Sequence, residues 1–162
     1  MTDRPGGAQR LTHVDEAGAA RMVDVSGKDV TVRTATASGR VLVSPEVVAL
    51  LRGGAVPKGD ALAVARIAGI QAAKRTPDLV PLCHPIAIHG VDVDLDVADD
   101  AVHVSATVRT ADRTGVEMEA LTSVAVAGLT MIDMVKAVDP RASITDVRLL
   151  RKSGGKSGQW TR

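Results

Sequence analysis

The sequence predicts an α+β protein of the ferredoxin-like, split βαβ type, in which helices pack on one face of an antiparallel sheet. Three features lead to this expectation. Residues 91–97 and 102–108 alternate apolar and polar side chains, and the short polar link between them predicts a hairpin. One strand is predicted before this hairpin and one after it. Helical segments separate these parts, and the order β-α-α-β-β-α-β gives the split βαβ pattern when the first two helices form one crossover.

The first strand and the first helix are predicted from residues 30–54. Residues 30–43 alternate apolar and polar side chains, as a half-buried strand does. Ser44, Pro45 and Glu46 then indicate a helix start. Ser caps free N–H groups, Pro suits the first turn, and Glu lies near the positive end of the helix dipole. The pair Gly53-Gly54 is expected to end this short helix.

The remaining elements follow from apolar patterns and their boundaries. A second, alanine-rich helix is expected from Asp60 to about Arg75, where Thr76-Pro77 stops it. A loop with several prolines, residues 77–85, then leads toward the hairpin. A long helix is predicted for residues 115–138, and a last strand for residues 144–150. Because aromatic residues make up only 1% of the chain, the core must consist of Val, Ala, Leu, Ile and Met.

Length and composition predict one folded domain. The chain has 162 residues, of which 45% are hydrophobic, so it is long and apolar enough to bury a core. We assign this folded domain to residues 11–151. Residues 1–10 are rich in Gly and polar side chains, and we expect a flexible tail there. Residues 152–162 are rich in Gly, Ser and Lys, and they predict a second flexible tail.

The composition also argues against several classes of partner. The scarcity of aromatic residues disfavours base stacking, and a net charge of +1 gives no strong attraction to nucleic acid or to an anionic membrane. The most apolar stretch, residues 116–138, carries charges at both ends and is no convincing membrane span. Cys83, the single cysteine, fits a reducing compartment. We therefore expect a cytoplasmic protein that binds neither nucleic acid nor membrane.

The long helix suggests a site that two chains build together. Its middle is apolar nearly all round, so one sheet cannot cover it, and another subunit is a natural second cover. Met118, Glu119, Asp133 and Lys136 fall on one third of its circumference. However, Glu119 and Asp133 lie about 21 Å apart along the axis. Either one end is not catalytic or two chains share the site, and we favour the second interpretation.

Plain structural interpretations of these residues remain open. Asp133 and Lys136 are three residues apart and can form a surface ion pair worth only about 0.3–0.5 kcal/mol. Thr114 and Glu117 match a capping box, so Glu117 can simply cap the long helix. Both possibilities are compatible with the sequence.

Several cations are candidates for binding phosphate. Lys58 precedes a helix start, where free N–H groups also attract anions. Lys74 ends the same helix, where a cation stabilises the dipole in any case. Lys156 belongs to a Gly/Ser/Lys run that resembles a P-loop, but Leu150 stands where that motif needs glycine. This run can act as a lid or as a disordered tail.

A thiol and an imidazole stand side by side at Cys83 and His84. A metal site needs more ligands at suitable spacing, and no second cysteine exists. We therefore predict no metal site. His84 is a candidate for proton transfer or phosphate contact.

A series of short motifs, spread over residues 11–158, carries a resemblance to a known family. The segments in chain order are Leu11-Thr12-His13, Met22-Val23-Asp24-Val25-Ser26, Lys58-Gly59-Asp60, the stretch 65–76 (ARIAGIQAAKRT), Leu82-Cys83-His84-Pro85, the stretch 114–122 (TGVEMEALT), Asp133-Met134-Val135-Lys136-Ala137-Val138 and the stretch 152–158 (KSGGKSG). This series resembles the cyclic pyranopterin monophosphate synthase family, also called molybdenum cofactor biosynthesis protein C. The order of the motifs, rather than any single one, makes the resemblance specific.

The resemblance implies a reaction and an assembly. The reaction converts 3′,8-cyclo-7,8-dihydro-GTP into cyclic pyranopterin monophosphate and releases pyrophosphate, so the enzyme would be a phosphorus-oxygen lyase. The resemblance also implies a ferredoxin-like fold and a hexamer built as a trimer of dimers, with sites at the dimer interface. No cofactor is required by the sequence, although Mg²⁺ can help to shield the phosphates.

The resemblance assigns roles to residues of this chain. Asp133 matches the proposed catalytic acid/base, and we expect Lys136 and Lys58 to act with it. Proton transfers are needed to open one ring and close another, and cations are needed where pyrophosphate leaves. The expected substrate-binding residues are Leu82, Cys83, His84, Met118, Glu119, Lys74 and Lys156.

Two other functions are compatible with the residues. The first is a non-catalytic protein that binds a pterin or a nucleotide phosphate. The second is a metal-dependent phosphohydrolase that uses Glu119, Asp133 and the acidic row Asp92, Asp94 and Asp96. That row is more simply the wet face of a strand.

Overall fold

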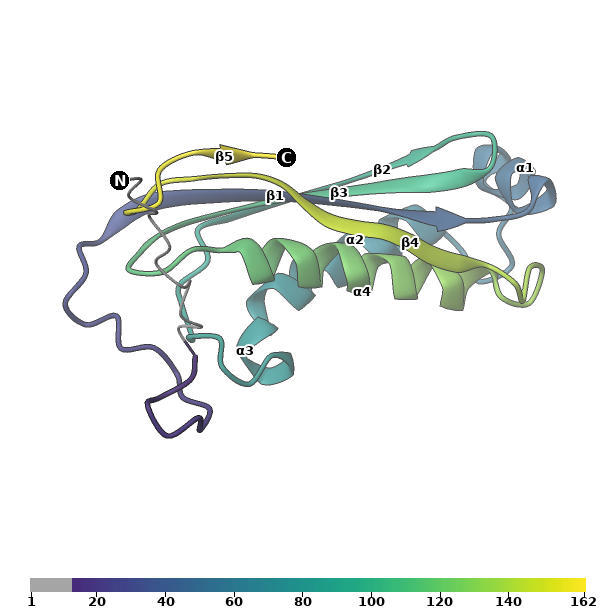
Figure 1. Ribbon diagram of the computed structural model, residues 1–162. Helices are drawn as coiled ribbons and strands as arrows, with labels where there is room; N and C mark the ends of the chain where they lie inside the picture. The colour runs from purple at the N-terminus through teal and green to yellow at the C-terminus, as the bar shows by residue number, and fades with distance from the viewer. Residues whose placement is uncertain (1–12) are drawn as a thin grey trace, which may run out of the picture.

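A five-stranded antiparallel sheet forms the framework of the computed structural model, which describes residues 13–162 (Figure 1). The strand order is β2-β3-β1-β4-β5. The strands are β1 (Thr31–Leu42), β2 (Gly90–Val97), β3 (Ala101–Asp112), β4 (Ser143–Ser153) and β5 (Trp160–Thr161). The expected N-terminal tail, residues 1–10, and the motif residues Leu11 and Thr12 lie outside the described residues.

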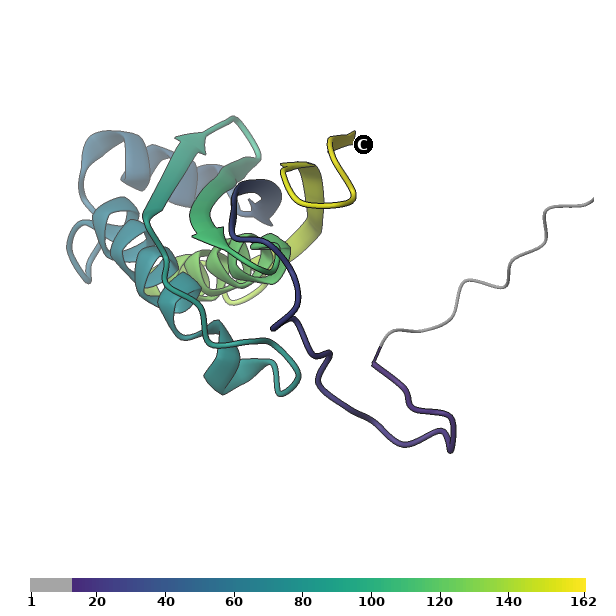
Figure 2. The same cartoon turned by 90° about the vertical axis from the view of Figure 1, so that its left-hand side faces the viewer.

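The helices lie on one side of this sheet, as Figures 1 and 2 show. They are α1 (Pro45–Gly53), α2 (Ala61–Lys74), α3 (Thr76–Leu79) and α4 (Glu117–Val135). Helix α4 packs across β1, β3 and β4, and α2 packs beside it and against β2. The predicted α+β, ferredoxin-like fold is therefore confirmed, and β5 extends its sheet beyond β4.

The ends of α1 and the start of α2 form where the sequence predicts them. The Ser44 hydroxyl accepts a hydrogen bond from the Val47 backbone N–H at 3.3 Å, with Pro45 in the first turn. Gly54 ends α1 in the left-handed conformation, with φ of 66°. Asp60 caps α2 by accepting from the Ala63 N–H at 2.9 Å. These local bonds fix where α2 begins and hence where the preceding Lys58 stands.

The core lies between the sheet and α4. The apolar members of the alternating strands, such as Val41, Val104 and Val108, point toward the apolar face of α4. Gly39 marks a close approach, because a Cβ atom there would lie 2.8 Å from the Val124 Cγ1 atom. Small residues thus let the helix approach the sheet closely enough to fill the space without aromatic side chains.

The structure differs from the sequence-based expectation at three places. Residues 76–79 form the short helix α3 instead of a loop. Helix α4 begins without a side-chain cap, so the capping box of Thr114 and Glu117 does not form, and Glu117 pairs with Lys152 instead. Part of the segment 152–162 is paired, since β4 reaches Ser153 and β5 adds to its edge. A Gly-rich turn reverses the chain between β4 and β5, whereas the composition predicted a flexible tail for this segment.

Helix α4 has the length and hydropathy of a membrane span. Half of its most apolar window is buried against the rest of the protein, and the core helix of a soluble protein has the same properties. Its apolar character is explained here by its contacts with three strands and with α2.

The close contact at Gly39 gives a testable prediction for stability. The substitution Gly39→Ala should lower the free energy of unfolding by about 1–3 kcal/mol, because the added methyl group overlaps a β-branched side chain that cannot move away. Denaturant unfolding at one protein concentration measures this. Gly53→Ala is the matched control, since a Cβ at Gly53 meets nothing within 4 Å. Equal effects of the two substitutions would contradict the packing argument.

Candidate active site

A cavity of about 400 Å³ opens at the amino-terminal end of α4. Four parts of the chain form its walls: the start of α4 with the residues just before it, the loop after α3, the segment that precedes β1 and the end of β4. The lining residues are His13, Val23, Val25, Lys28, Leu82, Cys83, His84, Thr114, Gly115, Glu117, Met118, Glu119 and Lys152. Five residues predicted to bind substrate thus meet here: Leu82, Cys83, His84, Met118 and Glu119.

His84 joins two of these walls. Its Nε2 atom lies 2.6 Å from the Val23 carbonyl oxygen. A carbonyl oxygen only accepts, so Nε2 carries the hydrogen and donates it. This bond holds the imidazole ring in place and leaves Nδ1 free to accept a proton from a ligand.

Among the acidic residues of the cavity, Glu119 has the pKa that is shifted most from its ordinary value. Its side chain is buried, with 3% of the residue exposed, although it lies in the first turn of α4. Burial disfavours the carboxylate, and the neighbouring charge of Glu117 adds to this, so the pKa of Glu119 rises to about 7. A carboxyl group with such a pKa can both give and take a proton near neutral pH.

Cys83 shares the cavity with Glu119 as a thiol. Burial raises the pKa of Cys83, and the charge of Glu119 raises it further. The thiolate is the nucleophilic form of cysteine. The surroundings of Cys83 therefore favour a packing and contact role over nucleophilic attack.

A second group of functional residues lies at the other end of α4. Lys58 donates to the Asp133 backbone oxygen at 2.8 Å and to its Oδ2 atom at 2.9 Å. Lys136 pairs with the other carboxylate oxygen, Oδ1, at 2.7 Å. The three predicted catalytic residues thus form one cluster, in which Lys58 joins the ion pair expected between Asp133 and Lys136.

The two lysines keep Asp133 ionised. Their hydrogen bonds and charges, those of Lys136 first, lower the pKa of Asp133 to about 2. All three side chains are about half exposed, so a ligand can reach them. The cluster offers a carboxylate that accepts protons and two ammonium groups that can bind phosphate oxygens.

The two groups cannot touch one small ligand within a single chain. Helix α4 has 19 residues and carries Glu119 in its first turn and Asp133 near its end. Their separation along the axis is about 21 Å. Lys74 and Lys156 join neither group, because Lys74 ends α2 and Lys156 lies in the turn between β4 and β5.

The cavity includes residues that sequence reasoning did not single out as a site. His13, Val23, Val25, Lys28, Thr114 and Gly115 line it. All of them except Lys28 belong to the motifs that carry the family resemblance, but that resemblance gave them no role, and only the folding of the chain brings the segment before β1 beside α4. Lys28 is the cation of this set. A search for charged side chains near the family motifs would have found it.

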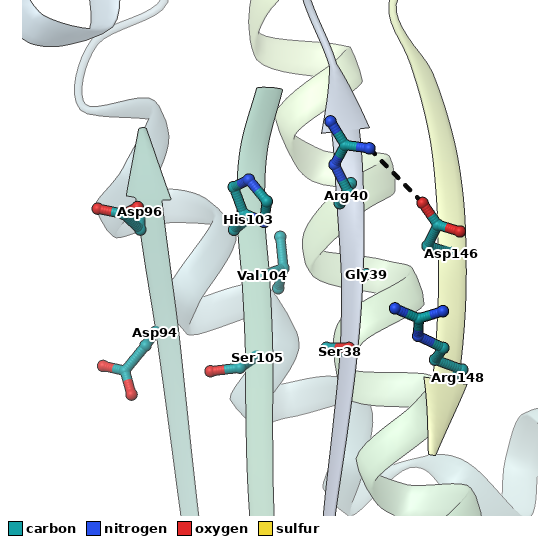
Figure 3. A pocket seen from close by; sticks show the side chains of 10 residues that line it. All are labelled: Ser38, Gly39, Arg40, Asp94, Asp96, His103, Val104, Ser105, Asp146 and Arg148. Atoms are coloured by element: carbon teal, nitrogen blue, oxygen red, sulfur yellow. Dashed lines mark ion pairs between the residues drawn. The ribbon is translucent and has the colours of Figure 1, made fainter. Parts of the chain in front are cut away.

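The acidic row of β2 lies on the outer face of the sheet, away from α4. A hollow of about 260 Å³ on that face is lined by Asp94 and Asp96 at one side and by Arg40 and Arg148 at the other (Figure 3). Asp92 is paired with Arg109 at 2.6 Å. Within residues 13–162, no three His, Cys, Asp or Glu side chains gather as a metal site would require. The arrangement does not support the metal-dependent phosphohydrolase.

Comparisons with known proteins agree on one family. The sequence profile described as "MoaC family" matches residues 22–155. A Streptomyces coelicolor protein named cyclic pyranopterin monophosphate synthase is 73% identical over 99% of this chain and 97% of its own length. A Nocardioides protein of the same name is 70% identical over 100% and 99%. The Mycobacterium tuberculosis protein named cyclic pyranopterin monophosphate synthase 2 is 60% identical over 94% and 91%.

The pKa of Glu119 predicts how stability depends on pH. The unfolded chain releases this proton near the ordinary value of 4.5, whereas the folded protein holds it to about 7. Stability is therefore fully present below the lower value and falls as the pH rises toward the higher one. The loss should reach up to about 3 kcal/mol, at roughly 1.4 kcal/mol for each unit.

Denaturant unfolding at about pH 5 and about pH 8, at one protein concentration, measures this change. Glu119→Gln should have the flatter pH profile, since glutamine does not titrate. Parallel profiles for the two proteins would refute the raised pKa.

Asp133 provides a second prediction, in the opposite direction. Lys136→Met and Lys58→Met should each raise the pKa of Asp133 toward its ordinary value of 3.8, Lys136→Met by more. NMR titration of the carboxyl carbon measures this shift. Lys156→Met is the control, because Lys156 lies in the turn between β4 and β5. A pKa of Asp133 that stays low in both variants would mean that the lysines are not its cause.

Proposed function

This chain belongs to the MoaC family, and we propose that it acts as a cyclic pyranopterin monophosphate synthase in molybdenum cofactor biosynthesis. Its substrate would be 3′,8-cyclo-7,8-dihydro-GTP, and its products cyclic pyranopterin monophosphate and pyrophosphate. The observation that carries this proposal is Asp133 held between Lys58 and Lys136. A carboxylate with two adjacent ammonium groups suits a reaction that moves protons and expels an anion.

The phosphate step requires both functions of this cluster. A hydroxyl oxygen of the substrate forms a bond to the phosphorus atom nearest the sugar, and the bond from that phosphorus to pyrophosphate breaks. The hydroxyl proton passes to a base, for which Asp133 is the ionised candidate. Lys58 and Lys136 would neutralise the charge that grows on the leaving pyrophosphate. Any Mg²⁺ would come with the phosphates, as a shield for their charge.

The ring rearrangement makes different demands. Opening one ring and closing another requires a group that gives a proton in one step and takes one in the next. Glu119, with a pKa of about 7, is suited to such exchange. His84 can supply or accept a further proton at Nδ1. We assign binding and proton transfer to this cavity, whose Leu82 and Met118 side chains provide apolar contact for a heterocycle.

Two chains would contribute to each site. The separation of Glu119 and Asp133 along α4 supports this, since a second chain in the opposite direction brings the two ends together. Exposed apolar side chains on α2 and α4, among them Ile67 and Leu129, provide surface for such contact. We propose the hexamer of three dimers that the family resemblance implies, and a cytoplasmic location, which suits the free thiol of Cys83.

Turnover tests the reaction. Purified protein should convert 3′,8-cyclo-7,8-dihydro-GTP into the pterin product with release of pyrophosphate, both measured directly. Asp133→Asn and Glu119→Gln should each lower the rate by about 100-fold or more, because each removes a proton-transfer group. Circular dichroism and size-exclusion chromatography check that the variants fold and assemble. Binding without product in the wild type would instead support the non-catalytic alternative.

Mixing the two inactive variants tests the shared site. In a dimer of one Asp133→Asn chain and one Glu119→Gln chain, one site carries both defects and the other carries none. Random co-assembly should therefore restore about one quarter of the wild-type rate. Mixtures that remain as inactive as their components would show that each chain builds its site alone.

A further inference from the structure

We propose that Asp139, a buried acid in the turn after α4, is a positioning residue that keeps Lys58 in contact with Asp133. It acts through α1, by holding the N-cap residue of that helix, and it touches neither Asp133 nor the substrate. This inference rests on the proposed function, because it takes the cluster of Lys58, Asp133 and Lys136 as the catalytic one. Asp139 stands just outside the motif of residues 133–138, and the family resemblance gave it no role.

Both carboxylate oxygens of Asp139 accept hydrogen bonds, and the residue is only 7% exposed. Its backbone N–H donates to the Val135 oxygen at 3.0 Å, so Asp139 is joined directly to the end of α4. Its Oδ1 atom accepts from the Arg141 backbone N–H at 3.0 Å, a local bond that shapes the turn. Its Oδ2 atom accepts from the Ser44 backbone N–H at 2.8 Å, across 95 residues of chain. This second bond joins two parts of the fold that the turn alone would leave separate.

The bond to Ser44 fixes the start of α1. Ser44 is the N-cap residue of this helix, so the Asp139 side chain lies near the positive end of the helix dipole. A hydrogen bond from a backbone N–H to a carboxylate is stronger than one between neutral groups, and burial removes the water that would compete with it. The start of α1 is therefore held firmly against the end of α4.

The other end of α1 leads to Lys58. Helix α1 ends at Gly53, and the turn after it carries Lys58. The Lys58 ammonium group returns to α4, where it donates to the backbone oxygen of Asp133 at 2.8 Å and to its Oδ2 atom at 2.9 Å. Figure 1 shows α1 and the turn after α4 at the same end of the sheet. The segment that contains α1 is thus bonded to the end of α4 twice, by Asp139 before the helix and by Lys58 after it.

The two attachments differ in strength. The Lys58 side chain is flexible and 43% exposed, and an ion pair between exposed side chains contributes at most about 1 kcal/mol. The buried bond to Asp139 is the stronger attachment, and it fixes the place from which Lys58 reaches Asp133. Without it, α1 is held mainly by its apolar side chains, and Lys58 also occupies positions away from Asp133.

The pKa of Asp133 reports the position of Lys58. Hydrogen bonds and charges of Lys136 and Lys58 hold this pKa at about 2, against an ordinary value of 3.8. Release of Lys58 in Asp139→Ala should raise the pKa of Asp133. Loss of the Asp139 charge alone would lower it, because a nearby like charge raises the pKa of a carboxyl group. The direction of the change therefore separates lost positioning from a direct effect of charge.

NMR titration of the Asp133 carboxyl carbon in the full chain tests the proposal. Asp139→Ala should raise the pKa of Asp133 by up to as much as Lys58→Met does, and adding Lys58→Met to Asp139→Ala should raise it little further. Adding Lys136→Met should still raise it, because Lys136 and Asp133 pair within α4 and do not depend on α1. Asp139→Asn keeps one acceptor oxygen, so it should give a smaller rise in a protein that folds more readily.

Two controls separate positioning from a general loss of structure. Asp15 also accepts two backbone N–H bonds, at 2.9 and 2.8 Å, but it lies in the segment before β1. Asp15→Ala should leave the pKa of Asp133 unchanged. Gly39→Ala, which loosens the contact between β1 and α4, should lower stability and also leave this pKa unchanged.

Turnover supplies the functional measurement. Asp139→Ala should lower kcat about tenfold or more with little change in KM, because Lys58 acts on charge that grows in the transition state. An unchanged or lowered pKa of Asp133 in both Asp139 variants would overturn the positioning role. The expected pKa changes without turnover in the wild type would leave that role in place and remove the synthase function. Normal turnover in the wild type with an unchanged kcat in Asp139→Ala would do the reverse.

Discussion

The packing of α4 against the sheet is the constraint on which the rest of the structure depends. The helix contacts three strands and α2, and small residues such as Gly39 and Ala127 let it lie close to the sheet. A helix held along its length in this way cannot bend to bring its ends together. It acts as a spacer that fixes Glu119 and Asp133 about 21 Å apart.

The ends of α4 place two carboxyl groups in opposite environments. Glu119 is buried in the first turn, and desolvation raises its pKa to about 7. Asp133 is half exposed between two lysines, which lower its pKa to about 2. The same side-chain chemistry thus supplies a group that exchanges protons near neutral pH and a group that stays ionised. The difference in pKa between the two carboxyl groups arises from where each lies along the helix, and not from residue type.

The sequence predicted the elements well because their signals are local. Ser44 and Asp60 cap helices by bonds to residues three positions along, so each signal is complete within one turn. The alternation in residues 91–97 and 102–108 shows which side of each strand is buried. The sequence also led to the cluster of Asp133 and Lys136, which is an ion pair within one turn, and the family resemblance added Lys58.

Long-range contacts could not be predicted in the same way. The partner of Glu117 is Lys152, 35 residues away, whereas the local pattern suggested a cap with Thr114. Residues such as Val23 and Lys28 enter the cavity only because the chain before β1 folds beside the loop of His84. The paired end of β4 depends on its register with β1, far away in the chain, which composition does not reveal, and β5 then pairs with this end of β4.

These contacts also explain why the amino-terminal end of α4 is without a side-chain cap. A capping residue would accept from the first N–H groups, and it would stand at the start of α4, where Thr114, Gly115 and Glu117 line the cavity. In its absence, Glu117 turns back over Gly115 and pairs with Lys152. The Glu117 carboxylate is thereby paired with an ammonium group, and not with the free N–H groups of the first turn. The first turn of α4 therefore lacks the stability that a side-chain cap would contribute, at the place where the proposed substrate would bind. The packing of the rest of α4 offsets this loss.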